Sequence, residues 1–545
     1  MSNTIDSHTS SAGSLRESDS LDVEKQAVGN ADGRIDELSW PRRVVVFLAL
    51  TLTMLLASLD LTIVTTTIPR ISVEFQALSD ATWIGTAYML TTTALQPLYG
   101  KVSDIFGRMP TLVVAIIVFA AGSAACGWAQ SMGVLIFGRA LQGVGGAGLL
   151  SLVFIVVSDL TSEEKRPAYL GVLGAVWSIA SVIGPVLGGV FADRASWRWA
   201  FWLNLPIAGP AAVAILLFLR LPLPSGSLWA KLRRVDFLGS AVLIGGVVML
   251  LLGLTWGGKT FPWSSARVVC LLVFGVVLLG AFIVIEWKVA AVPTVPVYLF
   301  RNRNVALCVA SQFFMGVGMY STMYFIPIWY TIVKNASAIA SGLHLLPFLL
   351  SLSLVSVAAG FVVTKLGHYR PFVVFGAGLF LVGAGLLILF NEDVSFAKQV
   401  GFLFIMGFGI GLNIQTALIA VQTAAPVKDM ASATTMYLFM RVLGSSMGIA
   451  ILQSVLQNAV IPKLDLLASQ YPEYAKTFTD SLNDQSLIYK SGLPDDIRDQ
   501  LIHGYALALQ KVFIAAVPFA AVAFLLVLGL KHVPIRKKLS PAMPE

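Results

Sequence analysis

Charge is scarce in this sequence. Only 12% of its 545 residues are Asp, Glu, Lys or Arg, whereas 57% are hydrophobic and the mean hydropathy is +0.81. Soluble domains carry about 25% charged residues, so a chain this poor in charge cannot cover a water-facing surface. We therefore expect lipid to surround most of the chain, and we exclude the ordinary soluble enzyme or binding domain.

Cysteines and catalytic motifs are also scarce. The three cysteines, Cys126, Cys270 and Cys308, fall within apolar runs, so we expect neither a disulfide framework nor a zinc site. We find no Walker sequence, no cluster of metal ligands and no nucleophile triad, and we predict no enzyme, no cofactor and no metal. The net charge of +8 comes from cations in short loops beside apolar runs, so we expect no nucleic-acid partner.

Long apolar runs are what the sequence has instead. A helix needs about 20 apolar residues to cross the hydrocarbon core of a bilayer. Fourteen runs of this size occur, near 44–68, 81–100, 110–127, 131–157, 169–192, 200–219, 237–256, 267–286, 304–333, 341–364, 371–390, 400–424, 432–459 and 511–530. The chain is thus predicted to be an all-α integral membrane protein. The even number of helices puts both ends on one side.

The distribution of cations predicts which side that is. Loops on the side of the amino terminus are rich in Lys and Arg, whereas the short loops opposite carry scattered ones. Both tails, at 1–40 and 536–545, are therefore expected in the cytoplasm, and the first is polar enough to be disordered. The segment 460–505 is predicted to be a long extracellular loop, either a lid or a solvated connector. Asn335 begins an Asn-Ala-Ser sequon and is a candidate glycosylation site.

Glycines repeat at a constant offset of 260 residues. The repeat pairs Gly100 with Gly360, Gly107 with Gly367, Gly184 with Gly444 and Gly188 with Gly448. We infer two six-helix halves, 41–220 and 304–535, joined by a linker at 221–303 that holds two inserted helices. Paired halves are typical of transporters, in which two bodies rock about a central site.

Two opposite charges lie deep in the predicted helices. Asp60 is the only acidic residue well inside any span, and a buried carboxylate there costs about 3 kcal/mol, so it needs a partner or a function. It could exchange a proton with a cavity, or it could only satisfy polar groups such as Thr62 and Thr65. Arg139 could neutralise a carboxylate, exchange partners when Asp60 is protonated, or extend its charge to the membrane surface.

One turn carries both glycine and charge. In Gly100-Lys-Val-Ser-Asp104-Ile-Phe-Gly107-Arg108 the glycines allow a tight turn, and Asp104 and Arg108 can pair with each other or with the facing half. A degenerate copy contains Gly360, Thr364 and Gly367 and lacks the acid. This segment resembles the loop signature of the major facilitator superfamily.

Three further stretches extend the resemblance to the fourteen-helix drug:proton antiporters of that superfamily, in a fungal form. They are Leu59-Asp60-Leu-Thr62-Ile63-Val64, Arg139-Ala-Leu-Gln142-Gly143-Val-Gly145, and the antiport-type helix motif Gly184-Pro185-Val-Leu-Gly188-Gly189. The resemblance covers residues 41–535. It implies a major facilitator fold with 14 transmembrane helices. It also implies a conformational switch at the glycine turn and proton coupling through Asp60 and Arg139.

Other polar residues lie within the apolar runs. Arg441 is either a substrate contact or part of a second pair that fixes helix register. Four amides could line a cavity or only bond neighbouring helices: Gln142, Gln312, Asn413 and Gln415.

The function predicted from these features is proton-coupled export of an amphipathic small molecule, such as a drug, toxin, secreted secondary metabolite or glycolipid. We expect a monomer in the plasma membrane whose partners are its cargo, the proton and the bilayer. A vacuolar carrier of basic amino acids has the same fold, and a transporter-like membrane sensor is the alternative of another class. Cationic cargo is disfavoured because Arg139 and Arg441 oppose it.

Overall fold

The computed structural model describes residues 39–77, 80–258, 260–290, 292–482, 487–531 and 533–534. The predicted cytoplasmic tail at 536–545 lies outside these residues, as does the tail at 1–40 apart from Ser39 and Trp40. Within the described residues the chain is helical and has no strand. The predicted all-α fold is therefore confirmed.

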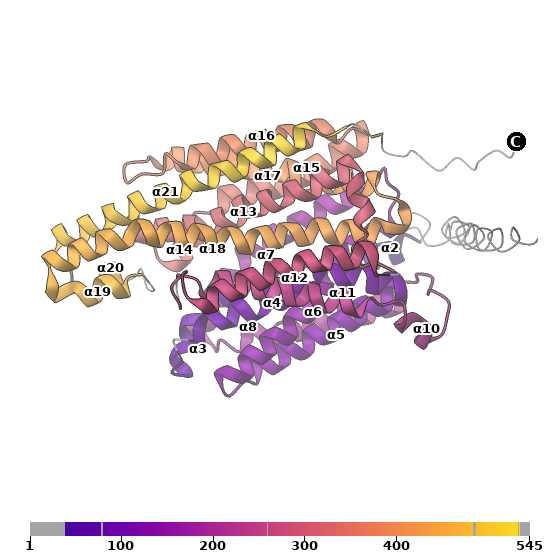
Figure 1. Ribbon diagram of the computed structural model, residues 1–545, viewed down its shortest axis with the longest axis horizontal. Coiled ribbons are helices and arrows are strands. Elements are labelled where there is room, and N and C mark those ends of the chain that lie inside the picture. The colour runs from indigo at the N-terminus through magenta and orange to yellow at the C-terminus, as the bar shows by residue number, and fades with distance from the viewer. Residues whose placement is uncertain are drawn as a thin grey trace, which may run out of the picture.

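The first half of the chain forms one bundle, drawn in indigo and purple in Figure 1. Its helices are α2 (Trp40–Ile63), α3 (Ile68–Glu74), α4 (Ala81–Phe106), α5 (Arg108–Gly127), α6 (Met132–Leu160), α7 (Arg166–Arg194), α8 (Trp199–Trp202) and α9 (Asn204–Phe218). A linker follows with α10 (Leu228–Leu232), α11 (Phe237–Trp256) and α12 (Ala266–Lys288).

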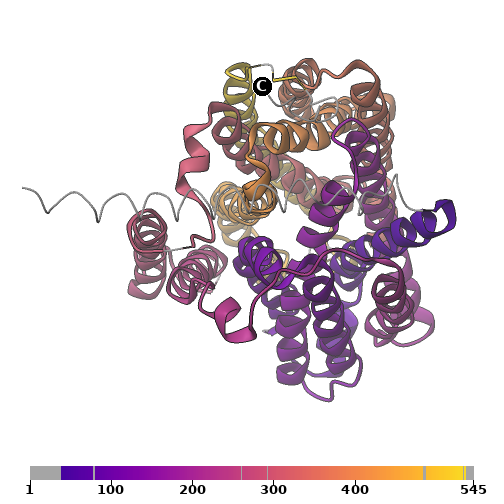
Figure 2. The same ribbon diagram turned by 90° about the vertical axis from the view of Figure 1, so that its right-hand side faces the viewer.

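The second half forms the bundle drawn in pink, orange and yellow in Figure 1. It contains α13 (Arg303–Val333), α14 (Ala338–Leu343), α15 (Leu346–Leu366), α16 (Arg370–Leu387), α17 (Phe396–Ala424), α18 (Met430–Gln470), α19 (Ala475–Asp480), α20 (Leu487–Lys490) and α21 (Asp495–Leu528). The linker helices α11 and α12 pack on each other, and α11 contacts α4 of the first bundle and α18 of the second. Figure 2 shows this pair beside the two bundles.

Thirteen helices of the described chain are long and apolar enough to cross a membrane. The fourteenth predicted span forms α4, which has 26 residues but is less apolar because it carries Thr91–Thr93 and Gln96. It is packed against α6 and α18, so its polar side chains have protein neighbours as well as lipid. The protein is thus a multi-pass membrane protein.

The repeated glycines make the same kind of contact in each bundle. A methyl group added at Gly184 of α7 would lie 2.0 Å from the hydroxyl oxygen of Thr62 on α2. A methyl group at Gly444 of α18 would lie 2.0 Å from the carbonyl oxygen of Phe313 on α13. In both bundles, glycine lets the fifth long helix touch the backbone or a side chain of the first.

The two bundles meet closely at the end where α2 begins and α21 ends, here called the terminal end (right in Figure 1). A methyl group at Gly100 of α4 would lie 2.7 Å from Thr435 of α18, and one at Gly360 of α15 would lie 2.3 Å from the carbonyl oxygen of Pro167 on α7. The Gln422 amide of α17 also donates a 2.8 Å hydrogen bond to Ser158 of α6. The protein is therefore closed at its terminal end.

The segment predicted as a loop at 460–505 is mostly helical, which corrects that description. The 41-residue helix α18 continues to Gln470, and α21 already begins at Asp495. The apolar side chains of Leu464, Leu467 and Leu501 are buried in the core of the second bundle, while charged residues cover the outer faces. The segment's charges indicated a solvated connector, but they occupy one side of amphipathic helices that project beyond the bundle (left in Figure 1).

Candidate functional site

The two buried charges form an ion pair inside the first bundle. A guanidinium nitrogen of Arg139 on α6 lies 2.7 Å from the carboxylate of Asp60 on α2, and the two side chains are 2% and 0% exposed. The Gln142 amide donates to the same carboxylate at 2.6 Å and the Asn204 amide of α9 at 3.0 Å. Both amides also donate to the hydroxyl of Ser123 on α5. The carboxylate of α2 is therefore bonded to α6 and α9, and Ser123 links the two amides to α5.

Aromatic rings enclose the guanidinium. The Arg139 side chain lies 4.4 Å from the ring centre of Tyr88 on α4 and 5.8 Å from that of Phe201 on α8. Its Nε donates a 2.9 Å hydrogen bond to the carbonyl oxygen of Ile84. Because the carboxylate, the ring faces and a carbonyl all favour its positive charge, Arg139 is compensated on several sides.

An apolar layer separates this ion pair from the end of the protein opposite the termini. The layer includes Ile63, Leu135, Trp197 and Phe201, all buried. Beyond it, Arg198 pairs with Glu74 at 2.8 Å, and Trp197 donates a hydrogen bond to the same carboxylate. Partial burial alone would raise the pKa of Glu74, but the hydrogen bonds from Arg198 and Trp197 outweigh it and lower that pKa. The layer closes Asp60 off from this end of the protein.

Two small spaces lie between the bundles and form the central cavity. Their volumes are about 40 and 30 Å³, far below the roughly 300–1,000 Å³ of sites that hold drug-sized ligands. Five residues from both bundles line both spaces: Met54, Phe154, Trp177, Tyr320 and Arg441. The rings of Trp177 and Tyr320 meet edge to face across the bundles, 6.1 Å apart. In this conformation the centre of the protein is nearly filled.

Helix α2 connects the central cavity to the buried ion pair. Ala57, Ser58 and Leu61 line one of the two spaces, while Asp60, on the same helical turn, is directed at α6. The same helix is held against α7 because Thr62 donates a 3.1 Å hydrogen bond to the carbonyl oxygen of Ala180. A change in the pairing of Asp60 thus acts on a helix whose other face touches the cavity.

The glycine turn carries a network of three charges. Gly107 joins α4 to α5 with a φ of +101°, a conformation that favours glycine. Arg108 pairs with Asp104 at 2.5 Å and with Asp159 near the end of α6 at 2.7 Å. Of these charges, sequence reasoning missed Asp159, which stands 51 residues from Arg108 and has no distinguishing pattern.

The antiport-type motif lies where α7 crosses α2. Gly184 faces the hydroxyl of Thr62, and Gly188 faces the carbonyl oxygen of Ile63. A Cβ atom at these glycines would lie 2.0 and 2.1 Å from those oxygens, too close for any larger residue. Pro185 lies within α7 and Gly189 is buried there.

The other predicted site residues lie in four different places. Gln415 and Arg441 line the central cavity, whereas Gln142 belongs to the buried ion pair. Gln312 donates to Asn413 at 3.1 Å, and Asn413 in turn donates to the carbonyl oxygen of Val373, so these two amides join helices within the second bundle. Asn335 is exposed in the turn between α13 and α14, with a φ of +49°.

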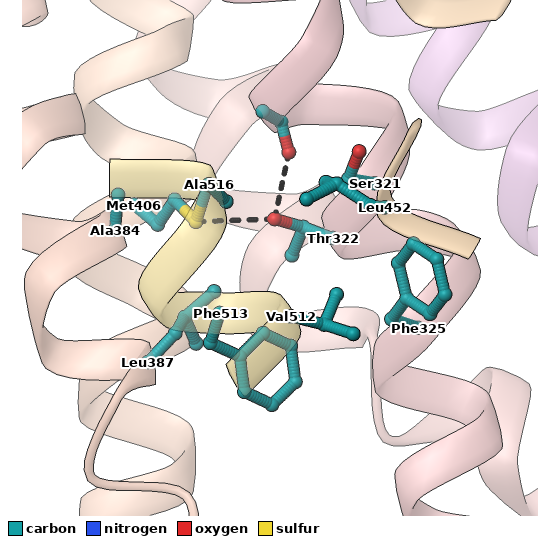
Figure 3. A pocket seen from close by; sticks show the side chains of 11 residues that line it. Ser321, Thr322, Phe325, Ala384, Leu387, Met406, Leu452, Val512, Phe513 and Ala516 are labelled. Atoms are coloured by element: carbon teal, nitrogen blue, oxygen red, sulfur yellow. Dashed lines mark hydrogen bonds between the residues drawn. The ribbon is translucent and has the colours of Figure 1, made fainter. Parts of the chain in front are cut away.

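A third small space, of about 10 Å³, lies within the second bundle and not between the bundles. Figure 3 shows its lining: Thr322 donates to Met406 and to a backbone carbonyl, and Phe325, Leu452 and Phe513 surround it. This space can hold about one water molecule, so it is a gap in packing and not a cargo site.

A second buried acid was not singled out in the sequence because it stands at the end of an apolar run. Glu286 of α12 is 4% exposed and accepts hydrogen bonds from the backbone N–H groups of Thr294 and Val295, each at 3.2 Å. It anchors the chain that leads from the inserted helices into α13. Among the described residues, no three or more His, Cys, Asp or Glu side chains gather in a group that could hold a metal ion.

Comparison with known proteins places this arrangement in a family. Residues 50–449 match the Major Facilitator Superfamily. The chain is 37% identical to the efflux pump dotC of Dothistroma septosporum, over 91% of this chain and 86% of dotC. It is 35% identical to the aspyridones efflux protein of Neocamarosporium betae, over 91% and 88% of the two chains. The crystal structure of the human organic anion transporter MFSD10 covers 90% of this chain and 100% of its own with a TM-score of 0.58, and at 18% identity it supports the fold alone.

Proposed function

The chain belongs to the major facilitator superfamily, and from that membership we propose that it exports amphipathic small molecules in exchange for protons. The family is one of transporters and not of enzymes. The fungal relatives of this chain are named efflux pumps or efflux proteins, and one of these names specifies the aspyridones. By this proposal the cargo is a toxin, a drug or a secondary metabolite.

The observation that carries the proposal is the Asp60–Arg139 pair beside a cavity shared by both bundles. Protonation of Asp60 removes the negative charge that Arg139 and the two amides bind, so the contacts that hold α6 and α9 to α2 weaken. Because α2 also lines the cavity, a proton on Asp60 favours a different packing of α2. Proton binding at Asp60 on one face of α2 and cargo binding in the cavity on its other face thereby favour different conformations of the protein.

The switch at the glycine turn and the closed terminal end complete the proposed cycle. Asp104, Arg108 and Asp159 join α4, α5 and α6, while Gly100 touches α18 of the other bundle. Parting of the bundles at the terminal end opens the cavity to the side on which α2 begins and α21 ends. We assign that side to the cytoplasm from the excess of Lys and Arg in its loops, with the protein as a monomer in the plasma membrane.

The test is export from energised membranes. Cells expressing the protein are loaded with a fluorescent amphipathic compound, and its efflux is followed with and without a proton gradient. Efflux that depends on the protein and stops when a protonophore collapses the gradient is the expected result. Efflux that persists at the same rate without the gradient would refute proton coupling.

A vacuolar carrier of basic amino acids is the weaker alternative. A cationic cargo needs carboxylates in the cavity, but among the described residues the lining supplies a cation, Arg441, and no acid. Imaging a tagged copy at the cell surface or at the vacuole separates the two assignments.

A further inference from the structure

Arg441 lies at the centre of the protein and has no ion-pair partner among the described residues. It lies on α18 and lines both spaces of the central cavity. Within the described chain, no carboxylate lies within salt-bridge distance of it, and its buried Nε has no hydrogen-bond partner. Arg139, the other cation deep in the bundles, has a carboxylate, an amide and two aromatic rings. The positive charge of Arg139 is therefore balanced by its neighbours, whereas that of Arg441 is not balanced by any carboxylate of the described residues.

An unpaired cation inside a membrane protein is costly, so its retention calls for a ligand that supplies the missing charge. The acids of the described residues cannot do so here. Asp60, two residues beyond the cavity-lining Ser58, is bound by Arg139, Gln142 and Asn204 on the far side of α2. Arg441 therefore presents a positive charge that faces the central cavity, and no carboxylate of the described residues pairs with it.

Other polar atoms around the cavity are free to bind a ligand. The carbonyl oxygens of the Gln96 and Gln415 side chains and the hydroxyl of Ser356 are buried, and none of the three atoms has a hydrogen-bond partner among the described residues. Gln96 lines one space, and Gln415 and Ser356 line the other. Together with Arg441 they place a few polar groups in a mostly apolar lining, as in sites that bind small molecules.

The rest of the lining is aromatic and apolar. Trp177 and Tyr320 present their rings from opposite bundles, and Met54, Phe154 and Leu150 add apolar surface. Aromatic faces and flexible methionine side chains suit a planar, hydrophobic body of variable shape.

Taking the proposed export function as given, we propose that the cargo is an amphipathic organic acid whose anionic group binds Arg441. The guanidinium binds a carboxylate, or an acidic enol in its ionised form, with two parallel hydrogen bonds. Gln96, Gln415 and Ser356 bind polar substituents of the cargo, and Trp177 and Tyr320 enclose its hydrophobic body. The anion binds at Arg441 on α18 and the proton binds at Asp60 on α2, so the two ligands that are exchanged use separate charges.

The experiment compares two probes that differ in charge. The purified full-length protein in lipid nanodiscs is titrated with 9-anthracenecarboxylate and with the uncharged 9-anthracenecarboxamide, and binding is read from probe fluorescence. We expect the carboxylate to bind the wild type more tightly than the amide. In R441Q, carboxylate binding should weaken by about tenfold to a hundredfold, the range for hydrogen bonds to charged groups, while amide binding changes less than about threefold. R441K keeps the positive charge but cannot form two parallel hydrogen bonds, so its affinity for the carboxylate should lie between those of the wild type and R441Q.

The matched control is R301Q, which removes the same charge from an exposed residue of the 3₁₀ turn Val297–Arg301, away from the cavity. It should leave both affinities unchanged. Equal binding of the two probes by the wild type, failure to bind either, or equal weakening of both in R441Q would overturn the anion site. Export is measured separately in vesicles, so a protein that selects the anion but does not move it would refute the export function and leave the anion site intact.

Discussion

At the scale of single residues, the carboxylate of Asp60 determines how the first bundle is held together. It accepts hydrogen bonds from Arg139, Gln142 and Asn204, each from a different position in the bundle. Breaking a buried pair by removing one partner typically costs about 3–5 kcal/mol, because the remaining charge stays buried. The buried ion pair of Asp60 and Arg139, on which the proposed proton coupling depends, therefore also makes Asp60 sensitive to mutation.

D60N should abolish proton-driven export. Asparagine keeps the size and an acceptor oxygen but cannot carry the proton, and it leaves Arg139 without its counter-charge. We expect loss of efflux together with a lower melting temperature of the purified protein. Efflux equal to the wild type across a proton gradient would remove Asp60 from the mechanism.

The double variant D60N/R139Q separates stability from coupling. With both charges gone, the uncompensated cation disappears, so thermal stability should recover relative to D60N alone. Export should stay absent because no proton is exchanged. Recovery of export in the double variant would contradict the assignment of Asp60 as the proton carrier.

Charge scarcity made the central residues of the site predictable. Asp60, Arg139 and Arg441 are visible in the sequence because ionised groups inside apolar runs are rare. Asn204 and Ser123 were not foreseen, since single polar residues are common in membrane helices and only packing decides which of them meet. For Gln142 the sequence leaves two roles open, lining a cavity or bonding neighbouring helices, because it does not reveal which face of α6 meets α2; in the structure Gln142 bonds neighbouring helices.

At the scale of elements, close contacts at glycine hold the terminal end closed. Gly100 and Gly360 each touch the other bundle, so a methyl group there must push the bundles apart. Overpacking of this kind costs about 1–3 kcal/mol, which is also the usual size of coupling energies between conformations. These contacts are thus well matched to control an equilibrium between open and closed ends.

G360A should favour the conformation that is open at the terminal end. Its Cβ would lie 2.3 Å from the carbonyl oxygen of Pro167, a backbone atom that cannot rotate away. Spin labels at the exposed residues Glu164 and Lys428, one on each bundle, should report a longer distance than in the wild type. The control is G385A on α16, where an added methyl group has no neighbour within 4 Å. An unchanged distance in G360A would contradict the gating role of this contact.

D104N should lower the transport rate more than it changes the apparent affinity for cargo. Arg108 keeps its 2.7 Å contact with Asp159, so the turn stays folded, but the charge balance between α4, α5 and α6 shifts. T364A in the second bundle removes only a hydroxyl that donates to the carbonyl oxygen of Gly360 at 2.8 Å, and it should have a much smaller effect. Rates and apparent affinities are compared in membranes with matched protein levels. Small and equal effects of both substitutions would mean that the turn is an ordinary loop.

At the scale of the whole molecule, hydrophobic run length was sufficient to predict the all-α membrane fold. The apolar runs became helices because each must satisfy its backbone within lipid. The repeated glycines became matched contacts of α7 with α2 and of α18 with α13. The segment 460–505 was misjudged because its charges hide an amphipathic pattern whose apolar side finds a partner only in the folded second bundle.

Topology gives the test at this scale. Tags attached at Ser2 and at Glu545, both outside the described residues, should be hidden from antibodies on intact cells and accessible after permeabilisation. The expectation rests on the even number of predicted spans and the cation excess in the loops on that side. Labelling of either tag on intact cells, with the protein at the surface, would reverse the proposed orientation.

The length of α18 has a consequence for observing the protein at work. The helix extends from Arg441 at the cavity to Gln470, a rise of about 44 Å at 1.5 Å per residue, and it includes Pro462 near its tip. Its outer part packs against α21 and α19, so we expect these helices to move together as one rigid unit. A tilt of about 10° near Arg441 would move its tip by about 8 Å over that length. A fluorophore pair placed on the tip and on the first bundle would then read each turnover from outside the membrane, as an optical signal from one molecule at a time.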